Sequence, residues 1–296
     1  MGLIRADAPV PGGAAAATVR TLAVLLAAGA APGAAWRHLA DTGDAVAGRI
    51  ADRVDDGASL PAAIETEGDG WREVAAAWEI GTTVGAPLAD VLRTVADALT
   101  DADAAADDVR IALAEPAGTA RLLLWMPPAG LLLSLALGFD TIGVIVGTPF
   151  GAAAVVLGLL LVLVARTWTA KLVRAAAAES GVPGIRAELT AAALSGGVSV
   201  DRALALVDAC GVTDATGGRT EQVLRLSRAA GVPAGELLRA DAARQRHAAR
   251  VDGRMRAARL ASRLLIPLGV CTLPAFLLLG VAPLMLSVLA GTPLPL

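Results

Sequence analysis

Three long runs without charged side chains dominate the hydropathy pattern of the chain. They cover residues 122–138, 141–165 and 264–289. A helix of about 20 apolar residues crosses a hydrocarbon core of ~30 Å, so the second and third runs are long enough and the first is at the short limit. The pattern predicts a hairpin of two transmembrane spans over residues 121–166, with Asp140 at its turn, and a third span over residues 264–290.

The segments outside these runs have the periodicity of amphipathic helices. Val46, Ile50 and Val54 recur every four residues, which predicts one buried helix face. A second apolar stripe follows Pro87 and consists of Leu88, Val91, Leu92, Val95 and Leu99. Two helix starts are marked by Ser59-Leu60-Pro61, an N-cap with proline in the first turn, and by the break at Gly68-Asp69-Gly70.

Composition extends this helical pattern to the whole chain. Hydrophobic residues make up 55% of the sequence and aromatic residues only 3%, so Ala, Leu and Val dominate. Ala and Leu favour helices. We therefore predict an all-α fold with two helical-bundle cytoplasmic domains, residues 14–120 and 167–263, and three transmembrane helices. Residues 1–13 are expected to be a disordered N-terminus, and residues 291–296 an extracytoplasmic tail.

Basic residues near the span ends predict the orientation. Arg110 and Arg121 precede the first run, Arg166 and Lys171 follow the second, and an arginine series from Arg244 to Arg263 precedes the third. The hairpin turn and the C-terminal tail have no basic residue. Because Lys and Arg are enriched in cytoplasmic flanks, both helical domains are expected on the cytoplasmic side of the inner (cell) membrane.

The net charge of −3 conceals two opposed halves, −9 over residues 1–121 and +7 over residues 166–263. Each half ends in a charged stretch before a predicted span. The candidate partner or inter-domain contacts are Asp97, Asp101, Asp103, Asp107, Asp108, Arg244, Arg246, Arg250, Arg254 and Arg256. We hypothesise that the two stretches pair as complementary helices, with Arg250 and Arg254 facing Asp103 and Asp107. Anchoring to anionic lipid and docking of an ATPase are the alternatives.

Two pairs of segments indicate an internal duplication. Gly85–Arg93 matches Gly231–Arg239 in its Gly, Pro, acidic, Leu and Arg positions, at an offset of 146 residues. Further upstream, Ala28–Trp36 is similar to Gly196–Leu204. The sequence therefore predicts a repeated unit of helical domain plus membrane span, with a shorter second copy.

These motifs resemble the type II secretion system F-domain family, the inner-membrane platform proteins of secretion systems and type IV pili. The resemblance covers most of the chain and rests on three glycine-led openings, Gly29–Trp36, Gly57–Ile64 and Gly197–Leu204. The passage at 114–127 and the Ala/Arg-rich composition are closest to the Tad/Flp pilus branch. One departure is Thr82 after Gly81, where many family members have glutamate.

The resemblance implies a non-catalytic platform. Such a protein would couple a cytoplasmic hexameric secretion ATPase to the extraction of pilin-like subunits from the bilayer and to their polymerisation. A second platform protein or a further copy of the same chain would be an additional partner.

Catalytic motifs are absent from the sequence. A P-loop requires Gly-Lys-Ser/Thr, whereas the sole lysine, Lys171, lies between Ala170 and Leu172. His38 and His247 are far apart and lack neighbouring ligands for a metal. We expect no enzymatic activity, cofactor, metal ion or nucleic-acid partner. A permease subunit driven by a separate ATPase and a membrane scaffold or sensor are the alternative functions, although the spans offer no polar midplane residues for a substrate path.

Overall fold

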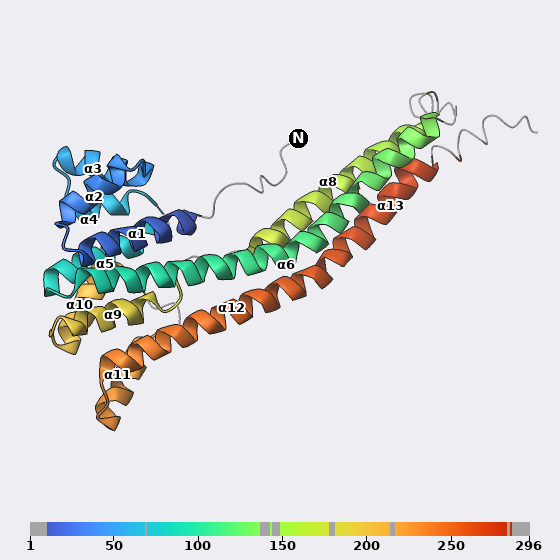
Figure 1. The fold of residues 1–296 in the computed structure, drawn as a ribbon. Coiled ribbons are helices and arrows are strands. Elements are labelled where there is room, and N and C mark those ends of the chain that lie inside the picture. Colours follow the sequence, from blue (N-terminus) through green and yellow to red (C-terminus); the bar gives the residue numbers. More distant parts are fainter. Residues whose placement is uncertain are drawn as a thin grey trace, which may run out of the picture. The chain divides into compact units, whose positions relative to one another are not determined.

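The structure, a computed structural model, describes residues 11–68, 70–136, 149–177, 181–213 and 217–282, together with residues 143 and 285. All regular elements within these residues are helices, which confirms the predicted all-α class (Figure 1). The chain divides into two compact units. The first unit, called the helical unit below, comprises Met1–Ala106 and Glu179–Val251, and the second, called the span unit, comprises Asp107–Ala178 and Asp252–Leu296.

Two long helices contribute residues to both units, α6 (Leu88–Ala136) and α12 (Ala234–Pro267). The other helices of the helical unit are α1 (Pro11–Ala27), α2 (Pro32–Asp41), α3 (Ala45–Asp55), α4 (Leu60–Glu65), α5 (Trp71–Val84), α9 (Ile185–Ser195), α10 (Val200–Ala209) and α11 (Arg219–Ala230). The span unit adds α8 (Pro149–Ala177), the π-helices η1 (Leu268–Thr272) and η2 (Leu277–Val281), and α13 (Leu273–Phe276).

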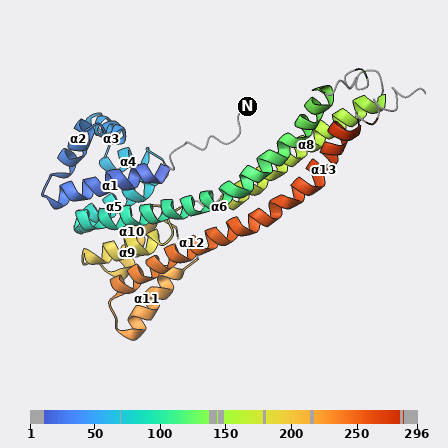
Figure 2. The same cartoon turned by 45° about the vertical axis from the view of Figure 1, so that its right-hand side comes forward.

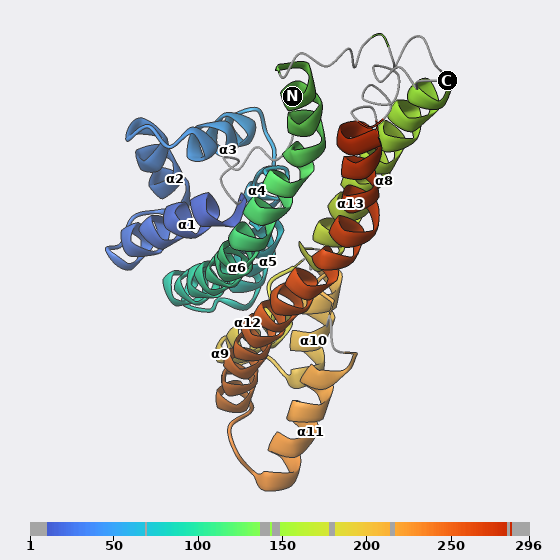
Figure 3. The same cartoon turned by 90° about the vertical axis from the view of Figure 1, so that its right-hand side faces the viewer.

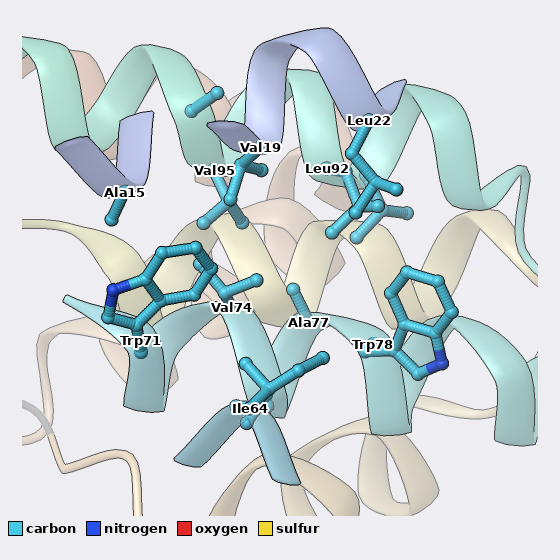
Figure 4. Packing of buried hydrophobic residues seen from close by; sticks show 14 of the residues in the cluster. Ala15, Val19, Leu22, Ile64, Trp71, Val74, Ala77, Trp78, Leu92 and Val95 are labelled. Atoms are coloured by element: carbon cyan, nitrogen blue, oxygen red, sulfur yellow. The ribbon is translucent and has the colours of Figure 1, made fainter. Parts of the chain in front are cut away.

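The main core of the helical unit lies between α1, α4, α5 and α6 (Figure 4). Its largest side chains are three tryptophans, and the ring centroid of Trp36 is 6.3 Å from that of Trp71 and 6.1 Å from that of Trp78. Tilted aromatic pairs at this separation stabilise a core beyond the area that they bury. Ile50 is fully buried and the flanking Val46 and Val54 pack against the same core, which confirms the predicted buried face of α3.

The predicted helix starts are confirmed, with one difference in their chemistry. α5 begins at Trp71 after Gly70, whose φ of 83° favours glycine, and α6 begins directly after Pro87. α4 begins at Leu60 with Ser59 in the N-cap position, but the Ser59 hydroxyl makes no capping hydrogen bond. The side chain of Asp44 caps α3 instead, because its Oδ1 accepts from the backbone N–H groups of Val46 and Ala47, each at 2.9 Å.

Helix α9 occupies the centre of the helical unit (Figure 2). One of its faces joins the tryptophan core through Ile185, Leu189 and Ala193. The opposite face, with Ala187 and Ala191, joins a smaller core formed with α11 and α12. An 11-residue helix is therefore buried on both sides, and it connects the two parts of the sequence that were predicted to be separate domains.

Two glycines at the ends of α9 allow close approach of neighbouring backbones. A Cβ at Gly184 would lie 2.8 Å from the carbonyl oxygen of Ala242 in α12, and one at Gly196 would lie 2.8 Å from that of Val84 in α5. Contacts this short leave no room for a methyl group. Glycine is therefore required at both positions for α9 to fit between its neighbours.

The boundaries of the predicted domains differ from the structure in two places. Helix α1 begins at Pro11, three residues before the predicted start of the first domain. Residues 11–106 and 181–251 belong to one compact unit rather than to two separate bundles, because α5 packs against both α9 and α10. The predicted hairpin turn at Asp140, the N-terminal residues 1–10 and the C-terminal tail lie outside the described residues.

Within the span unit, α8 runs beside η1, α13 and η2 in the opposite direction (Figure 3). Gly158 marks their closest approach, since a Cβ there would lie 2.6 Å from Cγ of Leu279. Small residues at such crossings allow membrane helices to pack closely. The widened turn of η1 lies between Pro267 and Pro274, and because proline lacks an N–H group the hydrogen-bonding pattern has to change there.

Replacement of Gly196 by alanine should destabilise the helical unit by about 1–3 kcal/mol, since the methyl group would overlap the Val84 backbone. Its φ of −77° suits any residue, so the effect is steric alone. Gly33→Ala is the matched control, because a Cβ at Gly33 meets no atom within 4 Å. Thermal unfolding of the detergent-solubilised protein followed by circular dichroism measures both, and equal melting temperatures for the two variants would contradict this account.

Candidate functional site: charged contacts of helices α6, α9 and α12

A cluster of four charged side chains joins α6, α9 and α12 within the helical unit. Arg246 of α12 donates from Nε to Asp101 of α6 at 3.1 Å and from Nη1 to Glu188 of α9 at 2.9 Å. Arg250 lies one turn further along α12, with Nη2 3.7 Å from Oδ1 of Asp101. We call Asp101, Glu188, Arg246 and Arg250 the charged cluster.

Helical spacing explains why these residues meet. Arg246 and Arg250 are four residues apart, so both lie on one face of α12. Asp101 lies three residues beyond the fully buried Ala98, on the same side of α6, where the core gives way to polar contacts. A face that changes from apolar to charged along one helix keeps contact with its neighbour through ion pairs instead of hydrophobic burial.

Glu188 is the most buried member of the charged cluster, with only 4% of its side chain exposed. Burial penalises the ionised carboxylate and raises the pKa of Glu188 above its ordinary value, although the hydrogen bond from Arg246 acts in the opposite direction. Arg246 bonds only one of the two oxygens, because Oε2 of Glu188 is buried without a hydrogen-bond partner. The ion pair with Arg246 therefore does not fully offset the free energy needed to bury the ionised carboxylate of Glu188.

Two further ion clusters join α9, α10, α11 and α12, which we call the second half of the helical unit. Arg186 of α9 donates to Asp208 of α10 at 2.5 Å and to Glu221 of α11 at 3.0 Å. In the other cluster Arg219 of α11 donates to Asp241 of α12 at 3.1 Å. Each of the four helices is therefore tied to at least one other by a charged side chain that is largely withdrawn from water.

Sequence reasoning missed Glu188, Arg186 and Asp241. The sequence contains one weak indication of their importance. Arg186 and Glu188 alternate with the apolar residues of Ile185–Leu189, a pattern that does not suit a helix with only one buried face. Burial on both sides of α9 makes these residues structurally important, and that burial depends on helices far away in the sequence.

The other predicted contact residues lie in different surroundings. Asp97 accepts from Arg20 of α1 at 2.7 Å, and Asp107 pairs with Arg110 on its own helix at 3.0 Å. Arg244 pairs with Asp241 on its own helix. Asp103 and Arg256 are half-buried. Between the two charged stretches, Asp101 pairs with Arg246 and Arg250 and Asp108 pairs with Arg254, whereas the pairing of Arg250 and Arg254 with Asp103 and Asp107 stays a prediction.

The span unit contains a separate ion pair between α6 and α12. Arg254 donates from Nη2 to Asp108 at 2.8 Å. One residue earlier in α12, a Cβ at Gly253 would lie 3.0 Å from Cγ2 of Val109. The absence of a side chain at Gly253 thus permits α6 and α12 to approach closely where this pair forms.

Two helices of the described chain are long and apolar enough to span a membrane. These candidate spans are Pro149–Leu172 and the helical stretch Ala234–Leu279, whose apolar part is its C-terminal portion. Large apolar side chains on both point outward, including Phe150 with 79% and Val270 with 61% exposed. Such surfaces are unfavourable in water and favourable in lipid. The first predicted span coincides with the end of α6, where few side chains are described.

A double-mutant cycle should reveal strong coupling within the charged cluster. Arg246→Gln leaves buried Glu188 without its cation and should cost about 3–5 kcal/mol of unfolding free energy, whereas adding Glu188→Gln should restore part of it. The control cycle is Asp107→Asn with Arg110→Gln, an exposed pair expected to couple by less than about 0.5 kcal/mol. Additive effects at Glu188 and Arg246 in urea unfolding would contradict this expectation.

The raised pKa of Glu188 gives stability a defined pH dependence. Between its folded pKa and the ordinary value of 4.5, the folded state binds a proton that the unfolded state does not, so stability rises as the pH falls through this window. The wild type should therefore gain melting temperature relative to Glu188→Gln as the pH falls from neutral to about 4.5. Parallel profiles of the two proteins would show that Glu188 does not titrate differently on folding.

Glu67 provides the opposite case for comparison. Burial alone would raise its pKa, but hydrogen bonds from Arg49 and Arg53 outweigh burial and hold the pKa below 4.5. The wild type should accordingly lose stability relative to Glu67→Gln only below about pH 4.5.

One protein-family model matches the N-terminal part of the chain. Residues 18–136 match the family model described as type II secretion system (T2SS), protein F. The match includes Trp36, Trp71 and Trp78 and all of α6. No curated protein matches the chain. Residues 18–136, less than half of the chain, are therefore similar to the type II secretion system protein F family.

Proposed function

We propose that this protein is an inner-membrane platform of a Tad/Flp-like pilus or related secretion system. In this role it couples a cytoplasmic hexameric ATPase to the extraction of pilin-like subunits from the bilayer and to their polymerisation. The observation that carries the proposal is the protein F domain over residues 18–136, in a chain that also has two candidate membrane spans. The Tad/Flp branch is supported by the sequence passage at 114–127 and by the Ala/Arg-rich composition.

The helices offer a route for transmitting force without a catalytic site. α6 and α12 each contribute residues to the helical unit and to the span unit. Ion pairs join these two helices in each unit, Asp101 with Arg246 in the helical unit and Asp108 with Arg254 in the span unit. A partner that displaces either helix in the cytoplasm would thus act on a helix that continues toward the membrane.

We further propose that the chain is a duplicated unit, with α9, α10, α11 and α12 corresponding to α1, α2, α5 and α6. Several parallels support this correspondence. Gly85 ends α5 with φ 67° and Gly231 ends α11 with φ 68°, and the next helix begins three residues later in both cases. No helix lies between α10 and α11 in the described residues to correspond to α3 and α4. The shorter second copy therefore relies on ion clusters where the first has a tryptophan core.

The same proposal assigns the helical unit to the cytoplasm. Arg166 and Lys171 lie near the C-terminal end of the first candidate span, and the arginines of α12 precede the apolar part of the second. Cytoplasmic flanks are rich in such residues. An ATPase would then meet the helical unit, and pilin-like subunits in the bilayer would meet the apolar surfaces of α8 and α13.

Affinity purification of the detergent-solubilised protein from its native cells tests the platform function. A secretion-type ATPase and pilin-like subunits should be recovered with it. Recovery of a solute-binding protein or a nucleotide-binding transporter subunit in their place would refute the platform function and favour a permease.

An exposed charge reversal tests whether the acidic stretch contributes to docking. Asp97 is 61% exposed and pairs only with Arg20 among the described residues, so Asp97→Arg should lower ATPase recovery several-fold without unfolding the protein. Asp55→Arg, an equivalent reversal at an exposed position on α3, is the control. Equal recovery with both variants would place the docking surface elsewhere.

A further inference from the structure

The arginines along α12 fall into two groups with different surroundings. Arg246, Arg250 and Arg254 each lie against a carboxylate of α6. Arg259 and Arg263 are exposed, and within the described residues neither forms an ion pair. The sequence explains the difference, because no Asp or Glu occurs after Asp252. Within the described residues, the last two arginines before the apolar part of this helix therefore have no acidic partner.

Helix α8 has a matching cation on its side of the span unit. Lys171 is exposed, forms no ion pair within the described residues, and lies in a segment that contains no acidic residue between 141 and 178. Trp168, one turn away on α8, is 40% exposed. Tryptophan and lysine at the end of a span are the residues that membrane proteins place at the headgroup level.

Helix register brings these cations to one level. α8 and the end of α12 run in opposite directions, and Gly158 contacts Leu279. With a rise of about 1.5 Å per residue, Lys171 and Arg263 lie within about one helical turn of the same level, counted from that contact. Arg259 lies roughly one further turn along α12. We call Lys171, Arg259 and Arg263 the basic cluster.

Apolar surface begins directly beside the basic cluster. On α12 Ile266 is 54% exposed, and on α8 Leu163 is 62% exposed, each on the span side of the cations. A ligand that satisfies both features carries a phosphate at one end and a hydrocarbon chain at the other. The three cations, which form no ion pair within the part of the chain that the structure describes, also repel one another, so a neutral headgroup would leave this repulsion in place, whereas an anionic headgroup relieves it.

We propose that the basic cluster binds the headgroup of an anionic phospholipid. This lipid lies in the leaflet at which the apolar part of α12 begins. The phosphate lies between Lys171 of α8 and Arg259 and Arg263 of α12, and an acyl chain follows the exposed apolar side chains of the span unit. The bound lipid links α8 to α12 at the membrane surface. This proposal rests on the candidate spans crossing a membrane and is independent of which ATPase or subunit the protein serves.

Lipid titration of the full-length protein in neutral detergent tests the proposal. Phosphatidylglycerol with brominated acyl chains should quench part of the tryptophan fluorescence, and this part should be absent in Trp168→Phe. Brominated phosphatidylcholine should quench Trp168 only at much higher concentration. The double variant Lys171→Gln/Arg263→Gln should weaken the apparent affinity for phosphatidylglycerol by roughly five-fold for each cation removed. Arg225→Gln/Arg228→Gln, at exposed positions of α11, is the matched control and should leave the affinity unchanged.

Three outcomes would overturn the proposal. Equal affinity for phosphatidylglycerol and phosphatidylcholine would show that charge is not recognised. Competition by millimolar inorganic phosphate would indicate a site for free phosphate rather than lipid. Unchanged affinity in the Lys171/Arg263 variant, with its fold verified by circular dichroism, would place the lipid elsewhere. Arg263→Lys should retain most of the affinity, because it keeps the charge, and a loss equal to that of Arg263→Gln would point to a structural role.

Discussion

The helical unit depends on how α9 is accommodated between its neighbours. This short helix contacts the tryptophan core on one side and α11 and α12 on the other, so its polar residues Arg186, Glu188 and Thr190 are buried. Arg186 and Glu188 consequently require partners from α10, α11 and α12. Because a buried charge without its partner costs several kcal/mol, these requirements restrict where each of those helices can lie.

The two halves of the helical unit achieve stability by different means. The first half buries Trp36, Trp71 and Trp78 in a large apolar cluster. The second half buries mostly alanine and leucine, together with Val223, and adds ion pairs between helices. Apolar burial tolerates small shifts in helix position, whereas hydrogen-bonded ion pairs demand particular geometry. When helices of the second half move, specific ion pairs should therefore break or re-form, because these helices cannot slide smoothly past one another.

Local features of the fold were predictable from sequence, and long-range contacts were predictable only in outline. The α6 stripe from Leu88 to Leu99 and the helix start after Gly70 follow from periodicity and glycine placement. Opposite charge indicated that the acidic and basic stretches attract one another, but not their register, which depends on the full packing of α6 against α12. Glu188 could not be identified as a member of the charged cluster, because its burial is created by α12, dozens of residues later in the chain.

The contact between Asp101 and Arg246 spans 145 residues, which has a consequence for biosynthesis. The tryptophan core needs only residues up to about Leu99 for its main part, so it can assemble early as the chain emerges. Glu188 must wait until Arg246 has been made, and by then residues 107–178 have already left the ribosome. The order of synthesis thus places membrane insertion of α8 before completion of the helical unit. A chain arrested between α9 and α12 would leave this face of α9 uncovered and Glu188 without its cation, a state suited to recognition by quality-control proteases.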